Sequence, residues 1–199
     1  MQLLTRKHWV FDLDGTLTQP IHDFALIRSR LEIDPAEDIL DHLAALPEQQ
    51  RKEKLHQLDE LERFYTDQTQ PAHFVHEVIE LLWQRGCRLG ILTRNRQDLA
   101  QVSLEIIGIG HCFEPTAILG RDEAMPKPDP AGLNHLFELW QCSAADAVMV
   151  GDYRYDMEAG RAAGAATVHV SGQASGVWPE ITDLDVTSLE QLFELLNRS

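Results

Sequence analysis

Two acidic residues, Asp12 and Asp14, lie in the sequence Asp-Leu-Asp-Gly-Thr at the end of an apolar stretch. If a strand continues through them, alternation places both side chains on the same side. Two carboxylates that close repel each other, so at least one of them requires a cation or a proton. The alternative is an ordinary Asx turn, because Asp-Gly is common after strands. The apolar residues that lead directly into both acids favour a chemical role.

A second pair of acids, Asp152 and Asp156, lies in the sequence Gly-Asp-Tyr-Arg-Tyr-Asp after another apolar stretch. The first acid ends a predicted strand and the second enters the next helix, an arrangement that lets both converge on one hard cation. Mg²⁺ is bound by a few carboxylates and keeps several waters, which suits such a pair. The alternative is that Asp152 only caps the helix N-terminus.

Two further positions offer groups that suit an anion. Thr93 and Arg94 follow the apolar residues Ile91 and Leu92, and a hydroxyl followed by backbone N–H groups is able to hold a phosphate oxygen. A plain helix N-cap is the alternative. Lys127 lies in Met-Pro-Lys-Pro-Asp-Pro, where the prolines restrict its backbone. Its ammonium is a candidate phosphate contact, and a solvated lysine in a turn is the alternative.

The elements that would position these residues alternate between strands and helices. Apolar stretches predict strands near residues 9–13, 88–92, 117–119, 147–150 and 167–170. Strands that alternate with amphipathic helices are typical of the α/β class, with a parallel sheet covered on both faces. Each candidate residue lies just beyond the carboxyl end of a predicted strand or in a loop leading into one, and ligands bind at that edge of open α/β sheets.

The stretch at residues 20–70 differs, because it contains no Gly and is dense in charged residues. We expect it to be entirely helical. Asp34 is the predicted N-cap of one helix, with Pro35 at its first position and Glu37 closing a capping box. Pro47 begins the next helix. This block therefore predicts a second, all-helical domain inserted after the first strand and sitting over the sheet.

Composition limits the classes of protein that fit. The 199 residues are 44% hydrophobic and 25% charged, as in a globular protein, and the formal net charge is −15. This acidity argues against binding to nucleic-acid phosphates, which requires clustered Lys and Arg. The three widely spaced cysteines predict reduced thiols rather than disulfides or a zinc site. Since we find neither a secretory signal nor a membrane span, we expect a cytoplasmic protein.

Taken together and in order, the four motifs resemble those of the haloacid-dehalogenase-like hydrolase superfamily over the whole chain. The helical insert resembles the small α-helical cap of the phosphoglycolate-phosphatase-like branch. The resemblance implies a Rossmann-like α/β catalytic core with a parallel sheet, made of residues 1–18 and 72–199. It implies an inserted helical cap at residues 19–71.

The resemblance also implies a reaction in two steps. Asp12 would be the nucleophile that attacks phosphorus and forms an aspartyl-phosphate. Asp14 would be the general acid for the leaving alcohol and then the general base for the hydrolytic water. Dehalogenases of the superfamily lack an acid at this position, so Asp14 favours phosphoryl transfer over dehalogenation.

Mg²⁺ is the cofactor that the resemblance implies. The ion would be held by the carboxylate of Asp12, the backbone carbonyl of Asp14 and the carboxylate of Asp152. Asp156 would be a further ligand or would lie directly behind the ligands. Without the ion, a phosphate dianion would meet net negative charge, so an anionic substrate requires the bound metal.

The remaining candidates would contact the substrate. Thr93, with the backbone N–H of Arg94, would hold a phosphate oxygen. Lys127 would neutralise both the nucleophile and the phosphoryl group. The charges of Mg²⁺ and of this lysine would together balance the three site carboxylates, and positioning with electrostatics does most of the work in phosphoryl transfer.

The predicted function is therefore Mg²⁺-dependent hydrolysis of a small organic phosphomonoester, with phosphoglycolate or a sugar phosphate as the leading candidates. The expected partner is a small phosphorylated metabolite, with no nucleic acid and no membrane, and the sequence is compatible with a monomer. Two alternatives stay open: a phosphomutase of the same fold, and a non-catalytic regulatory module. Phosphate release separates a phosphatase from a mutase, and the intact set of acids, Thr93 and Lys127 counts against the module.

Overall fold

The structure is a computed structural model that describes residues 2–172, 176 and 178–199. The chain divides into two compact units. One unit consists of Met1–Pro20 with Thr69–Ser199, and the other is Ile21–Gln68. The helical insert expected from the sequence, residues 19–71, spans the second unit with slightly wider bounds.

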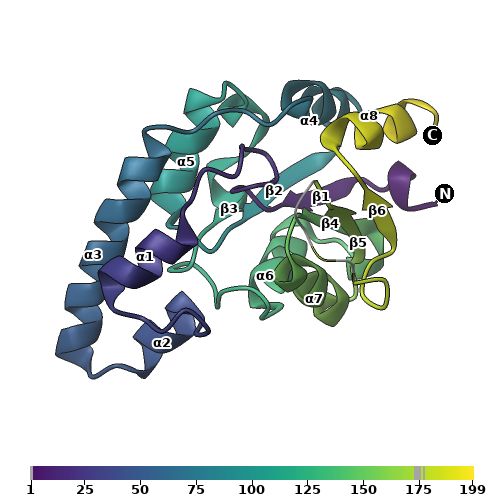
Figure 1. The fold of residues 1–199 in the computed structure, drawn as a ribbon. Helices are drawn as coiled ribbons and strands as arrows, with labels where there is room; N and C mark the ends of the chain where they lie inside the picture. Colours follow the sequence, from purple (N-terminus) through teal and green to yellow (C-terminus); the bar gives the residue numbers. More distant parts are fainter. Residues whose placement is uncertain (1, 173–175, 177) are drawn as a thin grey trace. The chain divides into compact units, whose positions relative to one another are not determined.

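The first unit is built around a six-stranded sheet in the order β3-β2-β1-β4-β5-β6, with every neighbouring pair parallel (Figure 1). The strands are β1 (His8–Phe11), β2 (Arg88–Leu92), β3 (Ile118–Leu119), β4 (Ala147–Gly151), β5 (Ala166–Val170) and β6 (Leu184–Val186). The predicted parallel α/β class is confirmed. Because β1 lies between β2 and β4, the chain leaving β1 emerges at the middle of the carboxyl edge.

Two strand predictions differ from the structure. The first strand was expected to continue to Leu13, but it ends at Phe11, so Asp12 and Asp14 lie in the loop that follows rather than alternating along a strand. The short strand β6 was not predicted. Only Val186 of its three residues is buried, so its sequence carries too weak an apolar pattern to be recognised.

Helices cover both faces of the sheet. One face packs on α4 (Val75–Gln84), α5 (Gln97–Ile106) and α8 (Leu189–Asn197), together with Trp9 and Phe11 of β1. The other packs on α6 (Ala131–Trp140) and α7 (Arg154–Ala163), together with Val10. Figure 1 shows α4 and α8 above the sheet and α6 and α7 below it. The remaining helical turns are short and of the 3₁₀ type: Gln2–Thr5, Gly110–Cys112, Pro115–Ala117 and Ala144–Asp146.

The second unit contains the helices α1 (Phe24–Leu31), α2 (Ile39–Ala45) and α3 (Glu48–Thr66). Its apolar core is formed by one cluster of buried side chains: Ile27, Leu31, Ile33, Leu43, Leu58 and Tyr65. Pro47 is the N-cap residue of α3, as the sequence predicted.

The predicted helix start at Asp34 is wrong. The Asp34 carboxylate accepts the backbone N–H of Ala36 (2.9 Å), which closes an Asx turn. The N-cap of α2 is Asp38, whose carboxylate accepts the N–H groups of Leu40 (3.0 Å) and Asp41 (3.2 Å). Both aspartates are good caps, and the helix begins at the one followed directly by apolar residues.

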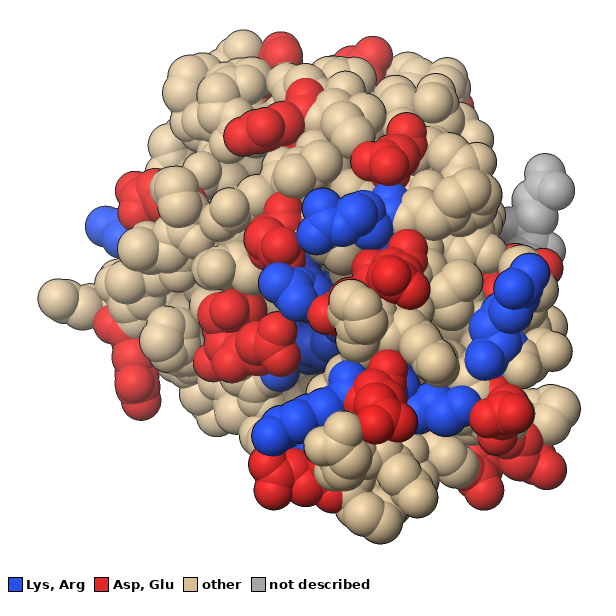
Figure 2. Space-filling model, turned by 90° about the vertical axis from the view of Figure 1, so that its left-hand side faces the viewer, with Lys and Arg blue, Asp and Glu red and all other residues tan. Residues whose placement is uncertain are grey.

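Charged side chains of both signs are interspersed on the face drawn in Figure 2. Exposed ion pairs occur in the second unit, where Lys52 lies 2.6 Å from Glu48 and Lys54 lies 2.7 Å from Glu32. Such exposed pairs contribute little to stability. Within the described residues, no helix combines the length and the apolarity that a membrane crossing requires.

Candidate active site

Asp12 lies at the middle of the carboxyl edge of the sheet. Its backbone N–H donates to the carbonyl oxygen of Val150 (2.8 Å), which extends the pairing with β4 by one residue. The residue is only 7% exposed. The chain then turns at Gly15, whose φ of +91° suits glycine, and a Cβ there would lie 2.6 Å from Oδ2 of Asp152. The turn therefore packs the first acidic motif directly against the last one.

Lys127 joins the first and last motifs through its buried ammonium. Its Nζ lies 2.5 Å from Oδ1 of Asp12 and 2.6 Å from Oδ1 of Asp156. The side chain is 2% exposed, so the ammonium has given up water for these two carboxylates. Burial by itself would lower its pKa, but the two carboxylates outweigh burial and raise the pKa to about 12, which keeps the lysine charged.

Three carboxylates form a compact acidic group. Oxygens of Asp12, Asp152 and Asp156 all lie within 4.8 Å of one another. The hydroxyl of Thr16 donates to Oδ1 of Asp152 (3.0 Å) and lies 3.4 Å from Oδ2 of Asp12, so it orients both acids. Hard oxygen ligands at this spacing suit a divalent cation such as Mg²⁺.

Asp156 is held differently from the other two acids. One of its oxygens contacts Lys127, and the other accepts the backbone N–H of Tyr153 at 3.0 Å. Gly151 permits this arrangement, since a Cβ there would lie 2.2 Å from Cγ of Asp156. The contacts fix Asp156 as the residue that orients the lysine.

The electrostatics of the acidic group favour a cation. Burial, followed by the charges of Asp12 and Asp156, raises the pKa of Asp152 to about 8. Burial also raises the pKa of Asp156 to about 6, against the opposing effect of Lys127. A single lysine thus does not compensate three acids, two buried and one partly buried, and a divalent ion would supply the missing positive charge.

Thr93 directly follows β2, the strand next to β1. The register pairs Phe11 with Ile91, so Thr93 follows β2 at the same edge at which Asp12 follows β1. Thr93 is 2% exposed, and its hydroxyl oxygen accepts the N–H of Asn95 (3.1 Å). That bond leaves the hydroxyl hydrogen able to donate to an anion.

The structure brings together four of the seven predicted site residues by direct contact or close approach: Asp12, Lys127, Asp152 and Asp156. Thr93 lies on the adjacent strand end. Asp14 is partly buried in the loop after Asp12 and is not one of the three clustered carboxylates. The guanidinium of Arg94 lies over the ring of Tyr155, with its Cζ 4.7 Å from the ring centroid.

Sequence reasoning missed His169, which is fully buried at the carboxyl end of β5. Its Nδ1 lies 2.7 Å from the carboxylate of Asp185, and its Nε2 lies 3.3 Å from the backbone carbonyl oxygen of Asp152. The imidazole therefore supports the backbone of an acidic site residue from behind. The available signal was a histidine within an otherwise apolar strand, Ala-Thr-Val-His-Val.

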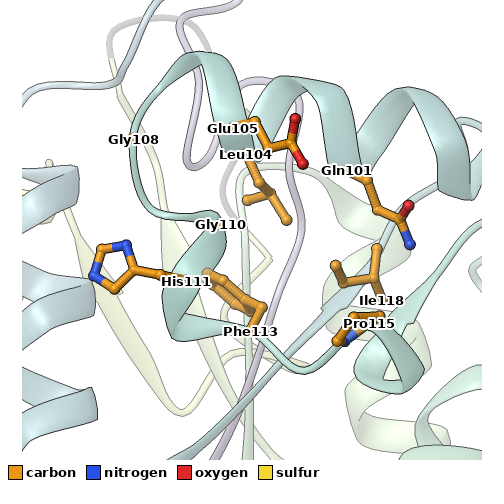
Figure 3. Close-up of a pocket in the computed structure, with 9 residues that line it drawn as sticks. All are labelled: Gln101, Leu104, Glu105, Gly108, Gly110, His111, Phe113, Pro115 and Ile118. Atoms are coloured by element: carbon orange, nitrogen blue, oxygen red, sulfur yellow. The ribbon is translucent and has the colours of Figure 1, made fainter.

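A pocket of about 370 Å³ lies elsewhere in the first unit (Figure 3). It is lined by residues of α5 and of the segment leading to β3: Gln101, Leu104, Glu105, Gly108, Gly110, His111, Phe113, Pro115 and Ile118. None of the predicted site residues lines it. Pro115 and Ile118 precede or begin β3, whereas the acidic group lies at the carboxyl edge of the sheet. The pocket is thus separate from the candidate chemistry.

Comparison with known proteins identifies related chains. The family model described as haloacid dehalogenase-like hydrolase matches residues 27–170. An uncharacterized hydrolase of Saccharomyces cerevisiae is 29% identical over 197 residues, covering 96% of this chain and 90% of its own length. The pyrophosphatase PpaX of Listeria monocytogenes is 29% identical over 184 residues, covering 84% of each chain.

A solved structure shares the fold. The crystal structure described as a predicted phosphoglycolate phosphatase from Haemophilus somnus has a TM-score of 0.73 and 21% identity. It covers 96% of this chain and 97% of its own length. The family match begins after Asp12 and Asp14, so the positions of these two residues rest on the geometry described above.

Proposed function

Because this chain belongs to the haloacid dehalogenase-like hydrolase family, we propose that it is a Mg²⁺-dependent phosphatase. Its substrate would be a small organic phosphomonoester, cleaved through an aspartyl-phosphate on Asp12. One observation carries the proposal: the ammonium of Lys127 lies between Asp12 and Asp156, within a group of three carboxylates. A buried cation against a buried nucleophile suits the transfer of a phosphoryl dianion.

The residues present fit a magnesium site. The carboxylates of Asp12 and Asp152, with the backbone carbonyl of Asp14, would hold the ion. Asp156 would orient Lys127 instead of binding the ion directly, since both of its oxygens already accept other contacts. The bound ion would supply Lewis-acid stabilisation of the charge on the transferring phosphoryl group.

The chain's own groups would then perform two displacements. The carboxylate of Asp12 attacks phosphorus as the bond to the leaving oxygen breaks, and Asp14 donates its proton to that oxygen. A water then attacks the aspartyl-phosphate, Asp14 takes the proton of that water, and inorganic phosphate leaves with Asp12 restored. Throughout, the hydroxyl of Thr93, the backbone N–H of Arg94 and the ammonium of Lys127 would hold the phosphoryl oxygens.

The relatives suggest which leaving groups to examine. Phosphoglycolate and sugar phosphates fit a phosphomonoesterase, whereas the similarity to PpaX makes pyrophosphate a second candidate substrate. Residues 21–68 are proposed as the cap domain of this family branch.

The proposal is tested by release of inorganic phosphate from p-nitrophenyl phosphate. We expect activity in the wild type with Mg²⁺, loss on chelation with EDTA, recovery on adding Mg²⁺, and no activity in Asp12→Asn. Asp146→Asn is the matched control, because Asp146 is an exposed aspartate at the opposite end of β4. Activity that survives in Asp12→Asn contradicts the nucleophile assignment, and activity unaffected by EDTA contradicts the metal site.

A further inference from the structure

Arg94 and Tyr155 make a contact that the proposed phosphatase chemistry does not use. The guanidinium carbon lies 4.7 Å from the centroid of the Tyr155 ring, a cation–π distance. The ring is itself packed edge-on against Tyr153, with centroids 5.1 Å apart. Arg94 is therefore held by an aromatic surface whose orientation is supported by a second ring.

The sheet topology shows where this contact lies. Arg94 follows β2, Tyr155 lies in the first turn of α7 after β4, and β1 runs between these strands. Neighbouring strands are about 4.8 Å apart, so the ends of β2 and β4 are separated by roughly 10 Å. A contact between side chains that follow these two strands therefore lies near the chain that leaves β1. That chain begins with Asp12, the proposed nucleophile.

The Arg94 guanidinium is not one of the groups proposed to hold the transferring phosphoryl group. Lys127 is already engaged by Asp12 and Asp156. Arg121 donates from Nη1 to the backbone carbonyl of Arg94 (3.3 Å), which brings a second guanidinium to the same loop. In a chain of net charge −15, two guanidinium groups thus lie at the loop after β2, at the carboxyl edge of the sheet.

We propose that the Arg94 guanidinium, held on the Tyr155 ring, binds a second anionic group carried by the leaving group of the substrate. This inference rests on the proposed phosphatase function and narrows its substrate class. The shared chemistry is an oxyanion, either a carboxylate or a second phosphoryl group. A guanidinium suits both, because its planar N–H groups match two oxygens at once.

Assays of the Arg94→Gln variant with three probes distinguish a carboxylate from a second phosphoryl group. The probes are 2-phosphoglycolate, which carries a carboxylate; pyrophosphate, which carries a second phosphoryl group; and p-nitrophenyl phosphate, which carries no second anion. We expect kcat/KM to fall about 10- to 100-fold for at least one of the first two probes, as for losing a charged hydrogen-bond donor. This loss should exceed any loss for p-nitrophenyl phosphate, which reports effects of the substitution on the phosphoryl group that the Arg94 backbone N–H would hold. The probe that is affected identifies the anion.

Two matched variants complete the test. Arg96→Gln is the control, because Arg96 lies on the same loop but pairs with Asp98 (2.9 Å), so it should leave the ratios between probes unchanged. Tyr155→Phe keeps the ring face and should retain the wild-type ratio of kcat/KM for the affected probe to kcat/KM for p-nitrophenyl phosphate. Tyr155→Leu removes the ring and should lower this ratio, as Arg94→Gln does.

The outcomes distinguish this inference from the function on which it rests. An equal loss for all three probes, or no loss for any, overturns the role of Arg94 while leaving the phosphatase proposal intact. A wild type that releases phosphate from none of the probes contradicts the phosphatase proposal itself.

Discussion

The raised pKa of Asp152 makes a quantitative prediction about metal binding. Burial and the neighbouring charges of Asp12 and Asp156 raise that pKa to about 8, so in the metal-free protein Asp152 is protonated below this pH. A carboxylate must lose its proton before it binds a cation. Acidification should therefore weaken Mg²⁺ binding, and a competition with one proton predicts affinity about 50-fold lower at pH 6 than at pH 8.

Isothermal titration calorimetry of the metal-free protein with Mg²⁺ at pH 6, 7 and 8, at constant ionic strength, measures this directly. In buffers of different ionisation enthalpy, the same titrations count the released proton. Thr16→Val is the informative variant, because the hydroxyl of Thr16 lowers the pKa of Asp152. Its loss should move the pH dependence to higher pH. Affinity that stays constant from pH 6 to 8 would refute this account of the acidic group.

Two substitutions test the packing of the site. Gly15→Ala places a Cβ 2.6 Å from Oδ2 of Asp152 at a positive φ, so we expect a loss of about 1 kcal/mol in the free energy of unfolding and Mg²⁺ binding weakened at least 10-fold. Urea unfolding and calorimetry measure the two effects, and an unchanged affinity would contradict the close packing. Lys127→Met leaves the carboxylates of Asp12 and Asp156 buried without their cation, and should cost about 3–5 kcal/mol in the absence of metal. Unfolding as stable as that of the wild type would show that the ammonium is not buried as described.

Local sequence patterns were sufficient to predict most of the sheet and the order of the candidate site residues. Each motif follows an apolar stretch that forms a strand, and the carboxyl ends of parallel strands share an edge, so Asp12, Thr93 and Asp152 could be placed together in advance. The prediction failed where two local signals compete. Asp34 and Asp38 are equally good caps, and packing of the following apolar residues selects Asp38.

Other features depend on contacts between distant segments, which no local pattern encodes. The sequence left open whether Asp156 is a ligand or lies behind the ligands, and its contacts with Lys127 and the Tyr153 N–H favour the second role. His169 was not recognised because its partners come from distant segments: Asp185 lies in β6 and the carbonyl of Asp152 follows β4.

The sequence by itself determined which residue types follow which strands, and hence the family and the edge at which chemistry is possible. This is because strand periodicity and the turn residues after each strand are local properties. Only the tertiary structure decided how charge is distributed there: that one lysine lies between two acids, that burial and neighbouring acids raise the pKa of Asp152, and that the Arg94 guanidinium lies over the Tyr155 ring. These outcomes arise from burial and from distances between chain segments, which exist only once the sheet has formed.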